Sequence, residues 1–259
     1  MNLSTLEWGI VGPAFVAGLL VLATHVPLGM QVLARGIVFI DLAIAQVAGV
    51  GVIAADTLGW EPQGWAVQIA AVTAALLGAL LLTFTEKRWP ARQEALIGVL
   101  FVLASCAGIL LLANNPQGGE HLKELLVGQI LWVNTGQLLA MATVTTLVLA
   151  LWAAIGRRLG PIGFYCLFAL AVTASVQLVG VYLVFASLIV PALATEPLKT
   201  VRARLLVGFA LGAGGYAVGL ALSSLIDLPS GPLVVLAMTA LAIAVAAARM
   251  ALQRQRPVH

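Results

Sequence analysis

Charged residues are scarce in this chain. Asp, Glu, Lys and Arg make up 9% of its residues, whereas they make up about a quarter of a soluble globular domain. Apolar residues account for 62% of the chain, and the mean hydropathy is +1.08. This composition excludes a soluble globular protein and leaves no stretch for a soluble catalytic domain. It predicts a polytopic membrane protein.

The sequence also lacks the motifs of most enzymes and nucleic-acid-binding proteins. Its two cysteines, Cys106 and Cys166, each lie in an apolar segment and are too few for a disulfide framework or a zinc knuckle. There is no Walker-type phosphate loop, no nucleophile elbow, no HExxH motif and no strip of basic and aromatic residues. We therefore expect no enzyme activity in this chain, no permanently bound cofactor and no nucleic-acid partner.

Apolar segments fill most of the chain. Most of them are near the ~20 residues that cross a bilayer as a helix. They lie at 8–30, 36–56, 64–85, 95–113, 136–156, 161–179, 181–195, 205–225 and 231–249. The two short segments on either side of Gly180 count as one span or two. We predict an all-α, polytopic integral membrane protein with about eight to nine transmembrane helices, in a single transmembrane domain over residues 1–259.

The basic residues predict how these helices are oriented. If nine helices cross the membrane with the N-terminus outside, one side receives Arg35, Lys87, Arg88, Arg92, Arg157, Arg158, Lys199, Arg202, Arg204, Arg249, Arg254 and Arg256. The other side receives only Lys123. Basic loops stay in the cytoplasm, so the first side is predicted to be cytoplasmic. The outer loops are then acidic, which either attracts cations or only keeps the loops soluble.

The longest stretch between apolar segments runs from Asn114 to Thr135, on the predicted outer side. Gly118 and Gly119 are followed there by Glu120, and further acidic and apolar residues come after it. Acidic residues suit the start of a helix, where they complement the helix dipole. We predict a short amphipathic helix on the outer surface or partly within it.

Asp41 is the most informative residue, because it lies inside the long apolar stretch from Arg35 to Gly49. A carboxylate at the centre of a membrane helix costs about 3 kcal/mol even on lenient insertion scales. Such a group normally faces a partner, an aqueous path or a bound cation. Asp41 therefore points to transport.

His25 lies about as far before the turn at 31–35 as Asp41 lies after it. In a helical hairpin the two side chains come to a similar depth and offer two ligands for a divalent cation. A third ligand could come from Gln46, Gln177 or His121. Zinc and manganese both accept such nitrogen and oxygen ligands. The predicted metal-ligating residues are Asp41, His25, Gln46 and His121.

Each candidate also has an interpretation without a metal. Asp41 and His25 could form an ion pair that holds two helices together. The glutamines could form hydrogen bonds between helices, and His121 could be an exposed polar residue. The GxxxG spacing within 212–219 allows helices to approach closely, and it favours packing within the chain over a dimer contact.

Five segments stand in order along the chain, at 35–43, 94–101, 126–131, 179–194 and 228–232. Together they resemble the membrane permeases of bacterial ATP-binding-cassette importers for zinc, manganese and iron. The segment 35–43 resembles the family's run of a basic residue, Phe and Gly-Asp-Ala-Leu, and 94–101 resembles its acidic Ile-Gly-Phe segment. The segments 126–131, 179–194 and 228–232 resemble its later blocks.

The resemblance implies a permease subunit in the bacterial cytoplasmic (inner) membrane. It implies a homodimer of permeases in the lipid bilayer, cytoplasmic ATP-binding-cassette ATPase subunits and an extracytoplasmic metal-binding protein. The implied cargo is a divalent metal ion, zinc or manganese rather than iron. In the family, a His one helical turn after the Asp that matches Asp41 is implicated with it in the metal path.

The chain departs from the family pattern in two places. The turn after Asp41 holds Ala45, with Gln46 beside it, so either His25 takes the place of the family His or the substrate differs. The segment that carries the family's docking helix for the ATPase shrinks to 156–161, roughly a score of residues too short. Coupling to an ATPase then uses another loop, such as 196–204, or is altered.

We expect the permease of a divalent-metal importer, with alternating access around a path near Asp41. Two alternatives stay open. The shortened loop suggests an ATPase-independent metal carrier. A non-transporting membrane assembly or sensor protein, in which Asp41 belongs to a structural pair, is the other.

Overall fold

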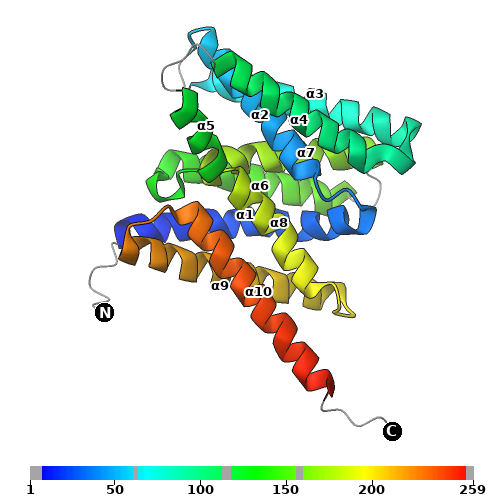
Figure 1. Cartoon of the computed structure of the whole chain (residues 1–259), viewed down its shortest axis with the longest axis vertical. Helices are drawn as coiled ribbons and strands as arrows, with labels where there is room; N and C mark the ends of the chain where they lie inside the picture. The colour runs from blue at the N-terminus through cyan, green and yellow to red at the C-terminus, as the bar shows by residue number, and fades with distance from the viewer. Residues whose placement is uncertain (1–7, 61–63, 113–117, 156–159, 255–259) are drawn as a thin grey trace.

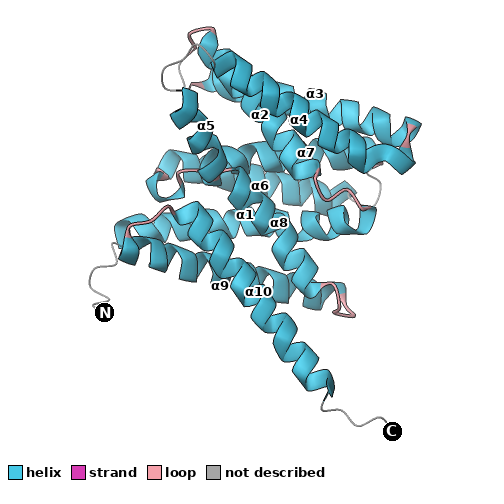
Figure 2. Ribbon diagram, viewed as in Figure 1, coloured by secondary structure: helices cyan, strands magenta, loops and turns pink. Residues whose placement is uncertain are grey.

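The computed structural model describes residues 8–60, 64–112, 118–155 and 160–254, which form helices joined by short turns without any strand (Figure 2). The helices are α1 (Trp8–Arg35), α2 (Ile40–Thr57), α3 (Trp65–Arg88), η2 (Pro90–Arg92), α4 (Gln93–Leu112), α5 (Gly118–Val127), η3 (Ile130–Trp132), α6 (Thr135–Ile155), α7 (Pro161–Val179), α8 (Val181–Thr195), α9 (Val201–Ile226) and α10 (Ser230–Arg254). The predicted all-α fold is confirmed.

Within these described residues, 8 helices are long and apolar enough to cross a membrane. Each of the nine predicted segments coincides with a helix. Helix α8 has 15 residues, about 22 Å at 1.5 Å per residue, so it is shorter than the ~30 Å hydrocarbon core of a bilayer. The predicted eight to nine transmembrane helices are therefore confirmed, and α8 accounts for the difference of one.

The long helices form two bundles with a layer between them. Helices α2, α3 and α4 form the first bundle, at the top of Figure 1, and α1, α8, α9 and α10 form the second. Helix α7 lies between them and contacts α2 and α3 on one side and α6, α8 and α1 on the other. Because α2 also contacts α7 and α8, it lies at the boundary between the bundles.

Contacts between helix ends show how the helices run. The backbone N–H of Phe39, just before α2, donates to Glu94 at the start of α4. Gln93, also at the start of α4, donates to Tyr165 near the start of α7. Arg35, at the end of α1, forms an ion pair with the end of α3 at the same place. Helices α2, α4 and α7 therefore start at one end of the protein, where α1 and α3 finish.

Most basic residues gather at this end, which we call the basic end. Arg249 donates to the carbonyl of Ala194 at 3.1 Å, so α8 and α10 also finish there. The described basic side chains at this end are Arg35, Lys87, Arg88, Arg92, Lys199, Arg202, Arg204 and Arg249. Arg157, Arg158, Arg256 and the side chain of Arg254 lie outside the described part of the structure. The fold agrees with the predicted one-sided distribution of basic residues, while the orientation in a membrane stays a prediction.

At the opposite end, three glycine turns touch through their backbones. Gly128 follows α5 and Gly180 separates α7 from α8, with φ angles of 73° and 81°. These angles favour glycine, and a Cβ atom on either residue would overlap the backbone of the other turn. A Cβ atom on Gly231, at the start of α10, would overlap the carbonyl of Val127. The predicted helix after Gly118 is thus α5, and its end is fixed against two other turns.

Helix α9 packs within the chain through its glycines. Cβ atoms on Gly212 and Gly219 would overlap Leu22 of α1 and the backbone of Val234 in α10. Small residues allow such close approach between membrane helices. The prediction that the GxxxG spacing serves packing within the chain is confirmed.

Candidate functional site

Asp41 lies in the first turn of α2, and the preceding turn places it inside the protein. Gly36 adopts a φ of 66°, and the N–H of Ile37 donates to the carbonyl of Val32 at 3.2 Å, so the chain folds back along the end of α1. Ile40 and Asp41 are then both 0% exposed. A backbone turn therefore holds Asp41 in the interior.

Neither carboxylate oxygen of Asp41 has a hydrogen-bond partner in the described part of the chain. Burying a polar group without a partner costs roughly 2 to 7 kcal/mol, and burying an isolated charge costs more. Ionisable groups inside membrane proteins normally pair with one another or mark an ion path. A buried carboxylate with both oxygens free is chemically suited to receive a mobile cation.

His25 is also fully buried, in the middle of α1. Its Nδ1 lies 2.9 Å from the carbonyl oxygen of Val21 and 3.0 Å from Oγ1 of Thr24, whereas its Nε2 has no partner among the described residues. No hydrogen bond or ion pair joins His25 to Asp41 within the described ranges. The structural alternative of a His25–Asp41 ion pair is therefore not present.

A cavity of about 10 Å³ lies where α2, α5, α7 and α8 meet, and it has room for roughly one water molecule. Gln46 and Gln177 both line it, and Nε2 of Gln177 has no partner within the part of the chain described. Ala45, one helical turn after Asp41, lines it too. The structure thus brings two candidate side chains, Gln46 and Gln177, to one small cavity next to the α2 turn that follows Asp41.

The candidates do not all come together. His121 lies on α5, but its side chain is outside the described residues. Among the side chains described, no three or more His, Cys, Asp or Glu residues are grouped so that they could hold a metal ion. The metal-ligating roles of Asp41, His25, Gln46 and His121 therefore stay predictions.

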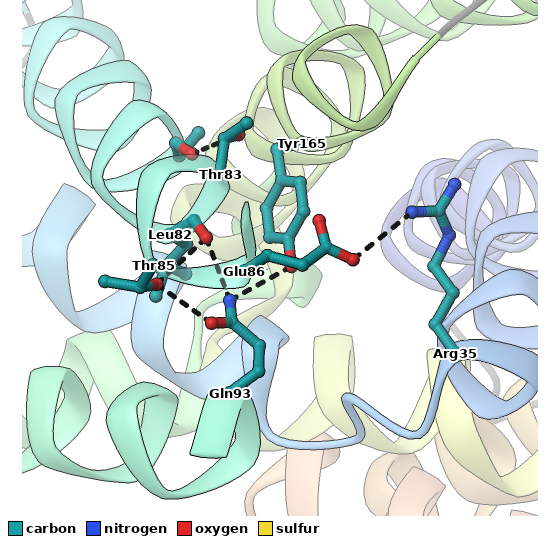
Figure 3. Close-up of polar contacts among 8 residues, drawn as sticks. Arg35, Leu82, Thr83, Thr85, Glu86, Gln93 and Tyr165 are labelled. Carbon is teal, nitrogen blue, oxygen red and sulfur yellow. Dashed lines mark hydrogen bonds and ion pairs between the residues drawn. The ribbon is translucent and has the colours of Figure 1, made fainter. Parts of the chain in front are cut away.

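A second polar cluster lies at the basic end (Figure 3). Nη1 of Arg35 lies 3.9 Å from Oε1 of Glu86, and the two side chains are 29% and 25% exposed. The guanidinium carbon of Arg35 also lies 4.1 Å from the centroid of the Phe164 ring. These contacts join the end of α1 to the end of α3 and the start of α7. They link the two bundles.

Gln93 extends this cluster to the start of α4. Its Nε2 donates to the Leu82 carbonyl at 2.9 Å and to the Tyr165 hydroxyl at 3.1 Å (Figure 3). Its Oε1 accepts a hydrogen bond from Thr85 at 2.9 Å. Gln93 is 4% exposed, and buried side chains with all polar atoms satisfied hold their neighbours in one arrangement. The turn between α3 and α4 is therefore fixed to α7.

This cluster is not predicted from the sequence. Glu86 directly precedes Lys87 and Arg88 and is indistinguishable there from a residue of a charged loop. Sequence analysis also misses Thr173, a buried residue of α7 whose Oγ1 has no partner among the described residues. The sequence feature that identifies Thr173 as a candidate is its spacing, because it stands one helical turn before Gln177 and so shares a face with it.

Comparison with known proteins identifies the family. A sequence model of the ABC 3 transport family matches residues 8–164 and 154–249. The chain is 27% identical over 252 residues to the manganese transport system membrane protein MntC of Halalkalibacterium halodurans, with 89% of this chain and 84% of that protein covered. It is also 27% identical over 251 residues to an uncharacterized membrane protein of Synechocystis, with 89% and 88% covered.

The fold is also similar to a solved structure, PsaBC from Streptococcus pneumoniae in complex with a Fab. The TM-score is 0.75 at 20% identity, and the match covers 92% of this chain and 91% of that chain. At this identity the likeness shows the fold. The family match extends from the start of α1 to near the end of α10, and the protein, a multi-pass membrane protein, therefore belongs to the ABC 3 transport family.

Proposed function

We propose that this chain is the permease subunit of an ATP-driven importer of a divalent metal ion, zinc or manganese, with the ion path passing Asp41. Family membership supports transport, and the name of the H. halodurans relative, a manganese transport system membrane protein, supports a metal ion as cargo. The path lies at the boundary between the two bundles. Alternating access is then a relative movement of the bundles on either side of Asp41.

The observation that carries this proposal is the state of the Asp41 carboxylate. It is fully buried, and neither oxygen has a partner in the described chain. A structural carboxylate in a membrane protein needs a permanent partner. A transport carboxylate needs free oxygens, because a permanent cation would occupy the position of the cargo.

The proposed assembly follows from the family. Two copies of this permease lie in the bacterial cytoplasmic membrane and bind ATP-binding-cassette ATPase subunits at the basic end, which is the cytoplasmic end under the positive-inside rule. An extracytoplasmic metal-binding protein delivers the ion at the opposite end. ATP is hydrolysed by the partner, since this chain carries no phosphate-binding loop.

The test is a charge-neutral substitution at Asp41. Asp41→Asn keeps the side-chain volume and removes the cost of burying a charge, so we expect membrane abundance equal to or above that of the unsubstituted protein. We expect metal accumulation to fall to the level of cells without the permease. Cellular zinc, manganese and iron are measured by mass spectrometry, together with the abundance of each variant in the membrane.

Asp56→Asn is the matched control. Asp56 lies on the same helix, at the opposite end from Asp41, and is half-buried. This control should accumulate metal normally. Normal accumulation of all three metals by a well-expressed Asp41→Asn protein would contradict the proposal.

The ATPase-independent carrier remains the second candidate because of the connection between α6 and α7. Helix α6 ends at Ile155 and α7 begins at Pro161, which leaves no room for a docking helix. Arg204 donates to the carbonyls of Leu198, at 2.9 Å, and Glu196, and these bonds hold the loop after α8 in one conformation. A loop held in this way is better suited to bind a partner. We propose that the ATPase binds this loop, residues 196–200.

Copurification decides between the importer and the carrier. The permease, purified in mild detergent from its own cells, should bring down an ATP-binding-cassette ATPase. Lys199→Glu, which reverses an exposed charge on the loop, should weaken the complex, whereas Lys87→Glu at the end of α3 should weaken it less. If no ATPase copurifies and metal uptake continues after ATP is depleted, the carrier is correct.

A further inference from the structure

One face of α2 and one face of α7 point toward the same cavity. On α2, Asp41 shares a face with Ala45, Ala48 and Val52, because spacings of four, seven and eleven residues return to the same side of a helix. Ala45, Ala48 and Val52 all line the cavity. Asp41 is therefore the first residue of the α2 face that carries the cavity.

The corresponding face of α7 contains Thr173. Val176 and Gln177 line the cavity, and Thr173 precedes them by one helical turn on the same side. Helices α2 and α7 both start at the basic end and contact each other. Thr173 on α7 and Asp41 on α2 therefore lie on the same side of the cavity, toward the basic end.

Four polar atoms on these two faces have no hydrogen-bond partner among the described residues. Asp41 and Thr173 are 0% and 1% exposed, and both oxygens of Asp41, Oγ1 of Thr173 and Nε2 of Gln177 are unbonded in the described chain. The next hydroxyl along α7 behaves differently. Ser175, on another face of the helix, donates to the Ala171 carbonyl at 2.8 Å. On α7, the described polar atoms without a hydrogen-bond partner therefore lie on the cavity face, whereas the hydroxyl on another face is hydrogen-bonded.

We propose that Thr173 and Gln177 form the second wall of the ion path, opposite Asp41, and that the path selects manganese over zinc. The proposal rests on the function proposed above and names its substrate. The donors on the two faces are a carboxylate, a hydroxyl and the amides of Gln46 and Gln177, and an amide can rotate to present its oxygen. Ala45 offers no ligand, and no histidine lines the cavity among the side chains that the structure describes.

The chemistry of these donors decides the cation. Carboxylate, hydroxyl, carbonyl and water oxygens suit hard divalent cations such as manganese, whereas zinc favours imidazole and thiolate ligands. One carboxylate with several neutral oxygens holds a divalent cation weakly enough to release it, as transport requires. Thr173 and Gln177 therefore determine which metal passes, while Asp41 supplies the charge that attracts any of them.

The experiment removes the oxygens of α7 one at a time in the full-length permease, produced together with its partner subunits. Thr173→Val and Gln177→Leu keep the size of the side chain. We expect each to lower cellular manganese accumulation by about tenfold, the lower end of what losing one group around a metal site costs. Zinc accumulation should change less, so that the ratio of manganese to zinc falls. Thr173→Ser restores the hydroxyl and should restore the ratio.

Two variants serve as controls. Ser175→Ala removes a buried hydroxyl from another face of α7, and Gln68→Leu removes a half-buried glutamine from α3. Both should leave the metal ratio unchanged at normal membrane abundance. If one α7 variant fails to reach the membrane, the other decides, because Thr173 and Gln177 are tested separately.

The outcomes distinguish this inference from the proposed function. If the unsubstituted permease accumulates no metal, the proposed function fails. If Asp41→Asn abolishes accumulation but Thr173→Val and Gln177→Leu match the controls, the function stands and the α7 wall is wrong. If the unsubstituted permease prefers zinc, or if both α7 variants lower zinc and manganese equally, the selectivity for manganese is wrong.

Discussion

The bundle of α1, α8, α9 and α10 and the bundle of α2, α3 and α4 are packed in different ways. On α9, a Cβ atom on Gly215 would lie 2.7 Å from Cβ of Met238, so neighbouring helices touch where glycines leave space. On α4, a Cβ atom on Gly98 would meet nothing within 4 Å, and one on Gly108 would lie 3.4 Å from Ile53. The interfaces of α9 are packed to backbone contact and those of α4 are not. Within the bundle of α2, α3 and α4, helices α2 and α3 also meet closely, since a Cβ atom on Gly51 would lie 2.7 Å from the Ala70 carbonyl oxygen.

The bundle of α2, α3 and α4 also contains an open groove. The groove has a volume of about 420 Å³ and is lined by Val47, Val50, Gly51, Ala54, Ala74, Leu77, Gly78, Leu81 and Leu100. Tightly packed interfaces have few alternative arrangements, whereas loosely packed ones can shift. The comparison teaches that α9 and its neighbours are a fixed frame, and that α4, which contacts the Asp41-bearing helix α2, belongs to the part with room to move.

Gly219→Ala should give the largest loss of stability, because it places a methyl group against the backbone of Val234. A backbone cannot rotate away, and overpacking of this kind costs about 1 to 3 kcal/mol or more. That cost should lower the midpoint of thermal unfolding in detergent by about 5 °C or more. The matched control is Gly214→Ala on the same helix, whose Cβ would lie 3.3 Å from the end of the flexible Leu241 side chain.

Equal midpoints for Gly219→Ala and Gly214→Ala would show that the close contact of Gly219 with Val234 adds no stability, and α9 would then not be a fixed frame. A lower midpoint for Gly219→Ala alone would support α9 as part of a fixed frame.

Arg35→Gln should have an intermediate effect, because Arg35 links the two bundles through Glu86 and Phe164. An exposed ion pair contributes up to about 1 kcal/mol and is screened by salt, and a cation–π contact contributes about 0.5 to 1 kcal/mol. We expect a loss of about 1 kcal/mol in the free energy of unfolding. Amide hydrogen exchange should also become faster at the ends of α1 and α3, where the bundles separate.

Arg88→Gln is the control for Arg35→Gln. Arg88 lies at the same end, and its guanidinium is 5.7 Å from the Trp89 ring, so its cation–π contact stays within the turn after α3. Hydrogen exchange that changes equally in both variants would show that Arg35 does not join the bundles.

The sequence predicts most of this fold because each helix is an apolar run ended by glycine, proline or charge. The Gly180 turn, the helix after Gly118 and the close packing of α9 all follow from local patterns. The sequence does not predict which helix faces which, because in a membrane the lipid is as apolar as a neighbouring helix. The Arg35 cluster at the boundary therefore stays hidden until the structure brings α1, α3 and α7 together.

The candidate site is predicted only in part, because the sequence does not show which helices face each other. The cost of burying a charge identifies Asp41 from the sequence, and the structure adds that its oxygens have no partner in the described chain. The alternative of an Asp41–His25 ion pair is not present among the described residues, since Nδ1 of His25 bonds within its own helix, while the shared metal site stays a prediction. Gln46 and Gln177 were two of several possible ligands, and only the contact of α2 with α7 shows that they line one cavity.

Gly98→Ala should give the smallest effect and the opposite sign. The added methyl group meets nothing within 4 Å, and alanine favours a helix over glycine by up to about 1 kcal/mol. Part of this gain comes from the unfolded chain, which loses conformational freedom, so we expect about 0.5 kcal/mol of added stability. The unfolding midpoint in detergent should rise by roughly 1 to 2 °C, with metal accumulation unchanged. A fall in the midpoint would mean that α4 packs against a surface that the isolated chain does not provide, such as a second permease, and the α2–α4 bundle would then be closed in the assembly.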